Sequence, residues 1–218
     1  MKNKPKFAVV LSGSGVFDGA EIHEATLTLY AIIKHNATYD IFAPDINQYH
    51  VINHITGEEM KETRNVLVES ARIARGKIYS LSKFNANKFD ALIFPGGFGA
   101  AKNLSDFAFK GSGCHVIEDV AEAIRNMVKL NKPIGALCIA PVLLAKILGD
   151  VLITIGNNQA TAEAVELMGA THKNTTHGET ILDKKYKIVT TPCYMLDANI
   201  LQIAEGAENA VKEILKLM

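Results

Sequence analysis

The stretch Lys132-Pro133-Ile134-Gly135-Ala136-Leu137-Cys138-Ile139-Ala140-Pro141 contains one cysteine between two apolar segments. Residues 133–137 have the length and character of a buried strand, and residues 139–148 have the length of a helix. A strand, a single nucleophile and a helix in this order form a nucleophile elbow, in which a tight turn holds one side chain above the carboxyl end of a sheet. The sequence therefore predicts that Cys138 is a nucleophile.

The residues around Cys138 allow either a reactive or an inert thiol. Pro141 suits the first turn of a helix, and the unpaired N–H groups and positive dipole end of that helix favour a thiolate. A cysteine buried between Leu137 and Ile139 would instead be an inert core residue. This stretch alone leaves both interpretations open.

The composition limits the classes of partner. The chain has 218 residues, 48% of them hydrophobic, which suits a single domain with a sizeable core over residues 1–218. Its 23 basic and 23 acidic residues give a formal net charge of zero, and no basic run interrupts the sequence. We therefore expect no nucleic-acid partner and no membrane partner.

The N-terminus and the cysteines bear on the cellular compartment. Residues 1–6 lead into only about five apolar residues, too few for a secretory signal or a membrane span. The three cysteines, Cys114, Cys138 and Cys193, are odd in number and widely spaced, which indicates free thiols rather than disulfides. We expect a cytoplasmic protein.

Strand-like and helix-like segments alternate along the chain. Strands are predicted at residues 6–11, 39–43, 90–94, 133–137, 151–155 and 187–191, and helices at 18–34, 116–130, 139–148, 160–168 and 198–217. This alternation predicts an α/β fold with a mostly parallel sheet and helices on both faces. A hairpin is expected around residues 182–187.

Residues 46–89 are less regular than the rest of the chain. They contain a possible hairpin around Thr56-Gly57 and a helix over about residues 63–75, ended by Gly76. The segment is longer than the usual connection in an alternating α/β unit, and long insertions are often functional. We interpret it as an insertion that covers the sheet edge or the site.

Ligands of parallel sheets bind beyond the carboxyl ends of the strands. The Gly96-Gly97 turn, Cys138 and the segment Thr190–Cys193 all lie at such ends. Glycines there allow backbone N–H groups to approach a ligand closely, although most such turns are only turns. The convergence of the three segments favours the functional interpretation of Cys138.

One acidic side chain in the first predicted helix has an unusual position. With Asp18 as N-cap, Glu24 falls on a second apolar stripe with Ala20, Leu27 and Ala31. A carboxylate there would be partly desolvated, which raises its pKa. The alternative is that Glu24 merely favours the positive end of the helix dipole.

Several long motifs resemble one known family. They are Asp18–Ala25, Ile41–Asp45, Thr63–Leu67, Phe94–Leu104, Cys138–Pro141 and Ile188–Pro192. These residues resemble the ElbB-type isoprenoid-biosynthesis proteins with a class I glutamine-amidotransferase-like domain, in the PfpI-like superfamily. The resemblance covers nearly the whole chain. It implies a flavodoxin-like three-layer sandwich, glyoxalase activity on small dialdehydes and a homodimer.

The resemblance also assigns roles to residues. Cys138 takes the place of the elbow cysteine, and Glu24 that of a protonated glutamate beside its sulfur. Gly97 and Ile139 would supply oxyanion-hole N–H groups. Many relatives carry a histidine soon after the elbow helix, where this chain has Ile155-Gly156-Asn157. This departure weakens a Cys-His-acid triad and any protease activity.

Three further residues are candidates for the pocket. Gly96 belongs to the glycine turn, His23 precedes Glu24, and Cys193 lies at a strand end. For His23 the alternative is an exposed helix histidine, and for Cys193 it is plain packing. Cys114-His115 has no further ligands nearby in the sequence, so no metal site is predicted.

The expected function is that of a cofactor-independent glyoxalase. Cys138 would add to glyoxal or methylglyoxal, and Glu24 would move a proton through an enediol-like state, so that water releases a 2-hydroxy acid. The alternative is a cysteine redox sensor or a metabolite-binding protein linked to isoprenoid biosynthesis. A glutaminase is less favoured, because His177-Gly178-Glu179 precedes the last strand, whereas the family's pair follows it.

Overall fold

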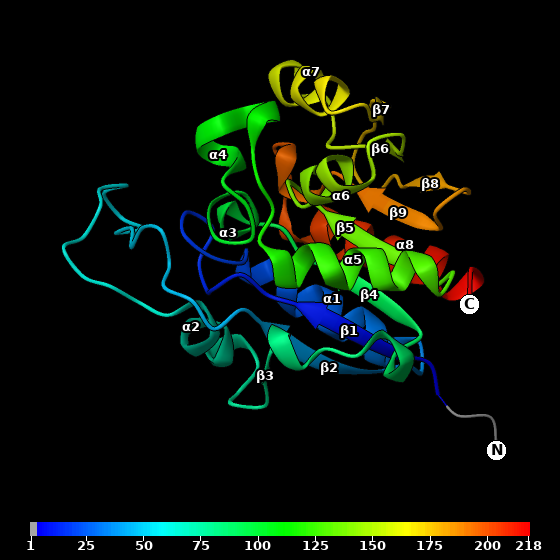
Figure 1. Cartoon of the computed structure of the whole chain (residues 1–218), viewed down its shortest axis with the longest axis horizontal. Coiled ribbons are helices and arrows are strands. Elements are labelled where there is room, and N and C mark those ends of the chain that lie inside the picture. The colour runs from blue at the N-terminus through cyan, green and yellow to red at the C-terminus, as the bar shows by residue number, and fades with distance from the viewer. Residues whose placement is uncertain (1–3) are drawn as a thin grey trace.

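A central sheet organises the computed structural model, which describes residues 4–218 (Figure 1). Its strand order is β3-β2-β1-β4-β5-β9-β8. The strands are β1 (Lys6–Val10), β2 (Thr38–Ala43), β3 (Tyr79–Ser80), β4 (Ala91–Phe94), β5 (Ile134–Leu137), β8 (Ile181–Asp183) and β9 (Ile188–Thr191). All neighbouring strands are parallel except β8 and β9, which form the hairpin predicted around residues 182–187. The predicted fold class, an α/β fold with a mostly parallel sheet, is confirmed.

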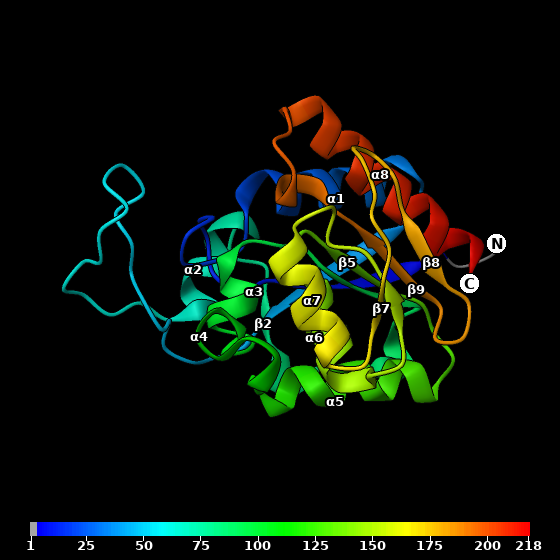
Figure 2. The ribbon, with the colours of Figure 1, turned by 90° about the horizontal axis from the view of Figure 1, so that it is seen from above.

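Helices cover both faces of this sheet. They are α1 (Ile22–Lys34), α2 (Val66–Ile73), α3 (Phe98–Lys102), α4 (Phe107–Lys110), α5 (Glu118–Lys129), α6 (Pro141–Leu148), α7 (Gln159–Leu167) and α8 (Ile200–Lys216). Helices α1 and α8 lie on one side of the sheet and α5 on the other (Figure 2). Because both faces are covered, strands β4, β5 and β9 are buried along their whole length, which explains their continuous apolar or small-residue sequences.

The strand predicted at residues 151–155 lies outside the main sheet. Residues Leu152–Ile153 form β6, which pairs with β7 (Thr171–His172) in a separate two-stranded sheet. Side chains of the main sheet hold it in place, since the Leu152 N–H donates to Asp183 Oδ2 at 2.7 Å and the Thr154 N–H donates to Thr190 Oγ1 at 2.9 Å. Hydrophobic pattern alone does not encode this side-chain pairing.

The predicted helix start at Asp18 is wrong, because α1 begins at Ile22 and its N-cap is Glu21. Residues 19–21 are held in an extended path, with the Gly99 N–H donating to Gly19 O at 2.8 Å and the Glu21 N–H donating to Gly96 O at 3.0 Å. These bonds fix the first loop against the Gly96–Gly99 turn and delay the helix by one turn. They also bring the start of α1 beside the turn that follows β4.

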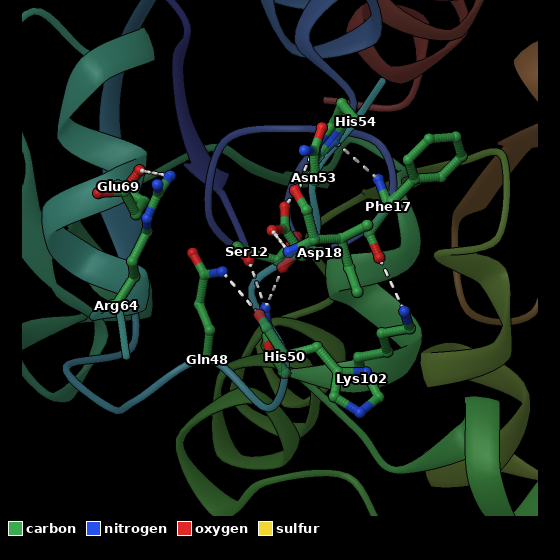
Figure 3. A network of polar contacts seen from close by, with 12 residues as sticks. Ser12, Phe17, Asp18, Gln48, His50, Asn53, His54, Arg64, Glu69 and Lys102 are labelled. Atoms are coloured by element: carbon green, nitrogen blue, oxygen red, sulfur yellow. Dashed lines mark hydrogen bonds and ion pairs between the residues drawn. The ribbon is translucent and has the colours of Figure 1, made fainter. Parts of the chain in front are cut away.

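Residues 46–65 form a loop that projects from the body (cyan in Figure 1). Two isolated antiparallel bridges join its two sides, Asn47–Asn65 at its base and Ile52–Glu59 around the expected hairpin. Polar contacts attach the base of this loop to the rest of the protein (Figure 3). Asp18 Oδ2 accepts the Ile52 N–H at 2.7 Å, and Asn103 Oδ1 accepts the Tyr49 N–H at 2.9 Å. Asp18 therefore anchors the loop instead of capping α1.

Candidate active site

Cys138 occupies a strained turn at the carboxyl end of β5. Its φ of 58° lies in the left-handed region, which costs a non-glycine residue on the order of 1 kcal/mol or more. The Cys138 N–H donates to Thr191 O of the neighbouring strand at 2.9 Å, and α6 begins three residues later with Pro141 at its first turn. This geometry presents the side chain above the edge of the sheet, as a nucleophile elbow requires.

Glu24 reaches this turn from α1. Its side chain is fully buried, and its carboxyl accepts two backbone N–H groups, from Gly96 to Oε2 at 2.9 Å and from Tyr194 to Oε1 at 3.1 Å. Its Oε2 and the Cys138 sulfur both lie against Gly96, so the two side chains are close neighbours. The structure thus brings together the two side chains that the sequence analysis paired.

Gly96 lies between these two side chains. A Cβ added to Gly96 would lie 2.5 Å from Glu24 Oε2 and 2.9 Å from Cys138 Sγ, distances that real carbon atoms do not tolerate. A residue without a side chain is therefore needed at this position for the acid and the thiol to meet.

Burial changes the acidity of Glu24. Desolvation raises its pKa from the usual 4.5 to about 8, and the negative charge of Glu21 adds to this rise. Hydrogen bonds from Tyr194, Cys138 and Gly96 oppose the rise without cancelling it. At neutral pH the carboxyl is therefore mostly protonated, in the direction that the second apolar stripe predicted.

The pKa of the Cys138 thiol is raised well above its ordinary value, mainly by burial and then by the negative charge of Glu24. The N–H groups of Gly97 and Ile139 donate toward the sulfur and lower the pKa, but they do not outweigh burial. The helix start was expected to favour a thiolate at Cys138. That expectation is wrong, because burial favours the neutral thiol more strongly. The whole residue is 7% exposed.

The N–H groups of Gly97 and Ile139, the two predicted oxyanion donors, both lie beside Cys138. Gly97 has a φ of 96°, and a Cβ there would collide with the backbone of residues 19–21. This conformation directs its N–H toward Cys138. Both N–H groups therefore act on the Cys138 sulfur itself, where they lower its pKa.

The two remaining pocket candidates have different surroundings. His23 is half exposed, and its Nδ1 lies 2.8 Å from the hydroxyl of Tyr194. Cys193 is buried in a turn with a φ of 41°, and a Cβ on Gly206 of α8 would lie 3.3 Å from its sulfur. Burial raises the pKa of the Cys193 thiol. No hydrogen bond joins either side chain to Cys138 among residues 4–218.

Sequence reasoning missed Tyr194. Its main chain contacts Glu24 and its hydroxyl contacts His23, and it belongs to the short turn η4 (Cys193–Met195). Its place in the sequence could have indicated it, because Tyr194 comes three residues after the end of β9 and therefore lies at the same sheet edge as Cys138. The contact itself spans 170 residues of sequence and leaves no local pattern.

Other candidate chemistry finds less support. The Glu179 carboxylate accepts the Thr176 N–H in its own turn, which lowers its pKa, rather than pairing with Cys138. Residues 4–218 contain no group of three or more His, Cys, Asp or Glu side chains arranged to hold a metal ion.

A hollow of about 710 Å³ is lined by residues 39–41 and 74–79 and lies away from Cys138. None of the helices within the described range is long and apolar enough to cross a membrane.

Comparison with known proteins places this geometry in a family. The DJ-1/PfpI family pattern matches residues 16–192. A crystal structure of an isoprenoid biosynthesis protein with amidotransferase-like domain from Ehrlichia chaffeensis is 33% identical, with a TM-score of 0.92 over 98% of this chain and 99% of that one. Glyoxalase III from Candida albicans has the same fold, with a TM-score of 0.61 and 13% identity over 98% of this chain and 97% of its own.

A close relative corrects the expected location. The chain is 47% identical, over 98% of its own length and 84% of the relative's, to the rat "ES1 protein homolog, mitochondrial". The cytoplasmic expectation is contradicted by this finding. It rested on the lack of an apolar run, which tests only for secretion and membrane insertion, whereas mitochondrial targeting segments are amphipathic and rich in Arg and Ser.

The resemblance to ElbB-type proteins is confirmed by these similarities, which extend over nearly the whole chain. The family pattern begins before α1 and ends at Pro192, directly after β9, so it covers the start of α1 and strand β9 but not the turn η4. The buried acid, the elbow cysteine and the glycine turn thus lie within the matched region, and the chain belongs to the DJ-1/PfpI family.

Proposed function

We propose that this protein is a cofactor-independent glyoxalase that converts glyoxal or methylglyoxal and water to the 2-hydroxy acid. The observation that carries the proposal is the placement of the buried Glu24 carboxyl and the Cys138 sulfur against the same glycine, Gly96. Burial, which raises the pKa of Glu24 to about 8, supports a protonated carboxyl at this place. The fold shared with glyoxalase III from Candida albicans supports it.

The first step is addition of sulfur to the aldehyde. The reactive form of the Glu24–Cys138 pair holds one proton, on Glu24. Because the pKa of the Cys138 thiol lies above that of Glu24, this form arises when the thiol passes its proton to the Glu24 carboxylate. The thiolate forms an S–C bond to the aldehyde carbon, and the carbonyl oxygen takes the Glu24 proton, which gives a hemithioacetal. One well-placed N–H donor to the developing oxyanion contributes about 3 kcal/mol.

The second step uses Glu24 as the base that the first step created. The carboxylate removes the C–H proton of the hemithioacetal carbon, and the electron pair forms a C=C bond while the neighbouring carbonyl oxygen takes the negative charge, which gives an enediolate. Glu24 returns its proton to the neighbouring carbon, the hydroxyl proton of the first carbon moves to the neighbouring oxygen, and the product is a thioester of the 2-hydroxy acid. Water then breaks the S–C bond, releases the 2-hydroxy acid and returns one proton to the pair, so that no external oxidant or cofactor is consumed.

The same geometry disfavours amide cleavage. Expulsion of an amine needs a group that carries a proton to the leaving nitrogen, as histidine does in a triad. No histidine donates to Cys138 among residues 4–218, and Glu24 has both oxygens engaged with main-chain N–H groups. A glutaminase is therefore not proposed.

The test is turnover of methylglyoxal by the purified protein without added thiol or metal. Proton NMR in D₂O identifies the product, and lactate that keeps protium at C2 would report direct transfer by Glu24. Absence of 2-hydroxy acid from the wild-type protein contradicts the proposal. Turnover that depends on added glutathione contradicts the cysteine mechanism.

A second candidate function is a cysteine redox sensor. The N–H groups of Gly97 and Ile139 that donate toward the Cys138 sulfur would also hold oxygens of a sulfinate. Burial raises the pKa of the thiol, which slows its oxidation and weakens this candidate. Mass spectrometry after mild peroxide distinguishes the two, because selective Cys138 sulfinate without aldehyde turnover supports the sensor.

A further inference from the structure

Tyr194 contacts two consecutive residues of α1 through two different groups. Its main-chain N–H donates to Glu24 Oε1 at 3.1 Å, and its hydroxyl lies 2.8 Å from Nδ1 of His23. The rings of Tyr194 and His23 also pack together, with centroids 5.9 Å apart. One residue of the turn η4 therefore touches both the candidate acid and the side chain before it.

The turn η4, which carries Tyr194, has few hydrogen bonds within itself. Cys193 has a φ of 41°, a conformation that costs a non-glycine residue free energy. Within the turn, the Met195 N–H donates to Pro192 O at 2.9 Å and the Leu196 N–H to Cys193 O at 3.2 Å. Side-chain contacts across the fold are needed to fix the direction of the Tyr194 N–H.

We propose that His23 and Tyr194 are positioning residues whose side-chain hydrogen bond holds the turn η4 against α1 and thereby keeps the Tyr194 N–H on Glu24 Oε1. The inference rests on the proposed function for its meaning in catalysis. With Oε1 occupied by this N–H, Oε2 is the oxygen left beside Gly96 and Cys138. The bond thus selects which end of the carboxyl faces the sulfur.

The bond does not depend on the protonation state of His23. A neutral imidazole accepts the tyrosine proton at Nδ1, and an imidazolium donates from Nδ1 to the tyrosine oxygen. The titratable groups that face Glu24 are Glu21 on its own helix, Cys138 after β5, and Cys193 and Tyr194 in η4. Loss of the N–H donor removes an interaction with the charged carboxylate, so Glu24 should titrate at higher pH.

The test measures the titration of Glu24 directly, by the ¹³C resonance of its labelled carboxyl group in the full-length protein. Tyr194→Phe and His23→Leu should each raise the midpoint by about 0.5–1 pH unit. His23→Asn keeps an acceptor near the position of Nδ1 and should stay within about 0.3 unit of the wild type. Tyr30→Phe, on an exposed face of the same helix, is the matched control and should not shift the midpoint.

A second readout is the pH dependence of Cys138 alkylation by iodoacetamide, followed by mass spectrometry at that residue. It should shift in the same direction for Tyr194→Phe and His23→Leu. If both variants melt like the wild type and titrate like Tyr30→Phe, the positioning role is contradicted. A wild-type protein that shows these shifts but no methylglyoxal turnover supports the positioning role while the proposed function fails.

Discussion

Cys138 and Cys193 have the same backbone situation but different neighbours. Both follow adjacent strands of the sheet, both have left-handed φ values, 58° and 41°, and both are buried, with 7% and 5% exposure. Burial raises the pKa of both thiols. The sulfur of Cys138 receives two N–H groups and the Glu24 carboxyl, whereas that of Cys193 lies against α8 beside Gly206.

This difference shows that an elbow does not by itself make a nucleophile. A positive φ at a strand end exposes a side chain, but a reactive thiol also needs a partner for its proton and donors for the oxygen of its substrate. Cys138 has both kinds of group. Cys193 also lies within the electrostatic reach of Glu24, but the N–H groups of Gly97 and Ile139 act on Cys138 and not on Cys193.

The largest contrast is expected from replacing the two sulfurs. Cys138→Ser should lower methylglyoxal turnover by more than about 1,000-fold, because the weaker serine nucleophile cannot form the hemithioacetal. Cys193→Ser should change turnover by less than about 5-fold. Steady-state kinetics on both variants checks this, and comparable losses in the two would remove the distinction between them.

Replacing the acid should have the next largest effect. Glu24→Gln keeps the size of the side chain and one of its two acceptor oxygens but cannot transfer a proton, so kcat should fall by about 100-fold or more. Thermal melting checks that the variant folds. Activity close to that of the wild type would show that Glu24 is only a structural residue.

Gly96 and Gly206, the glycines beside the two sulfurs, should differ in how well they tolerate substitution by alanine. Gly96→Ala forces a methyl group against Glu24 and Cys138 and should destabilise the protein by about 3 kcal/mol. In Gly206→Ala the added carbon lies 3.2 Å from Thr191 Oγ1 and 3.3 Å from Cys193 Sγ. The cost of this tight contact is offset by the higher helix propensity of alanine, about 1 kcal/mol. The free energy of unfolding should therefore change by no more than about 1 kcal/mol. Urea denaturation measures both, and equal tolerance would contradict the tight approach at Gly96.

The smallest expected effect is the pH dependence of the wild type. Burial raises the pKa of Glu24 to about 8 and that of Cys138 well above its usual range, so the pair carries two protons at neutral pH. The reactive form carries one. The value of kcat/KM should therefore rise about tenfold per pH unit up to about pH 8 and then level off. A rate that falls between pH 6 and pH 8 would contradict the one-proton form.

Much of the fold could be predicted because its strands are short and apolar. The strands at residues 90–94 and 133–137 are covered on both faces, so their sequences carry the signal without alternation. Helical spacing indicated partial desolvation of Glu24 but left open the alternative that it only favours the helix dipole. Its contact with Cys138 came from the resemblance, because no local pattern relates residues so far apart in the chain.

Other features depend on contacts that hydrophobic patterns do not encode. The delayed start of α1 follows from backbone bonds between residues 19–21 and the Gly96–Gly99 turn. The net acidity of Cys138 depends on how completely the fold excludes water, which overrode the helix dipole. Tyr194 was missed because its partners, Glu24 and His23, lie at the other end of the chain.

The two N–H groups that receive the Glu24 carboxyl come from residues 96 and 194, on opposite sides of the elbow in the sequence. During synthesis, the ribosome delivers the thiol well before it delivers the second of these donors. A nascent or truncated chain that ends before residue 194 thus carries the cysteine without the complete setting of its acid. Competence for the chemistry is therefore acquired only when the last quarter of the polypeptide has joined the sheet.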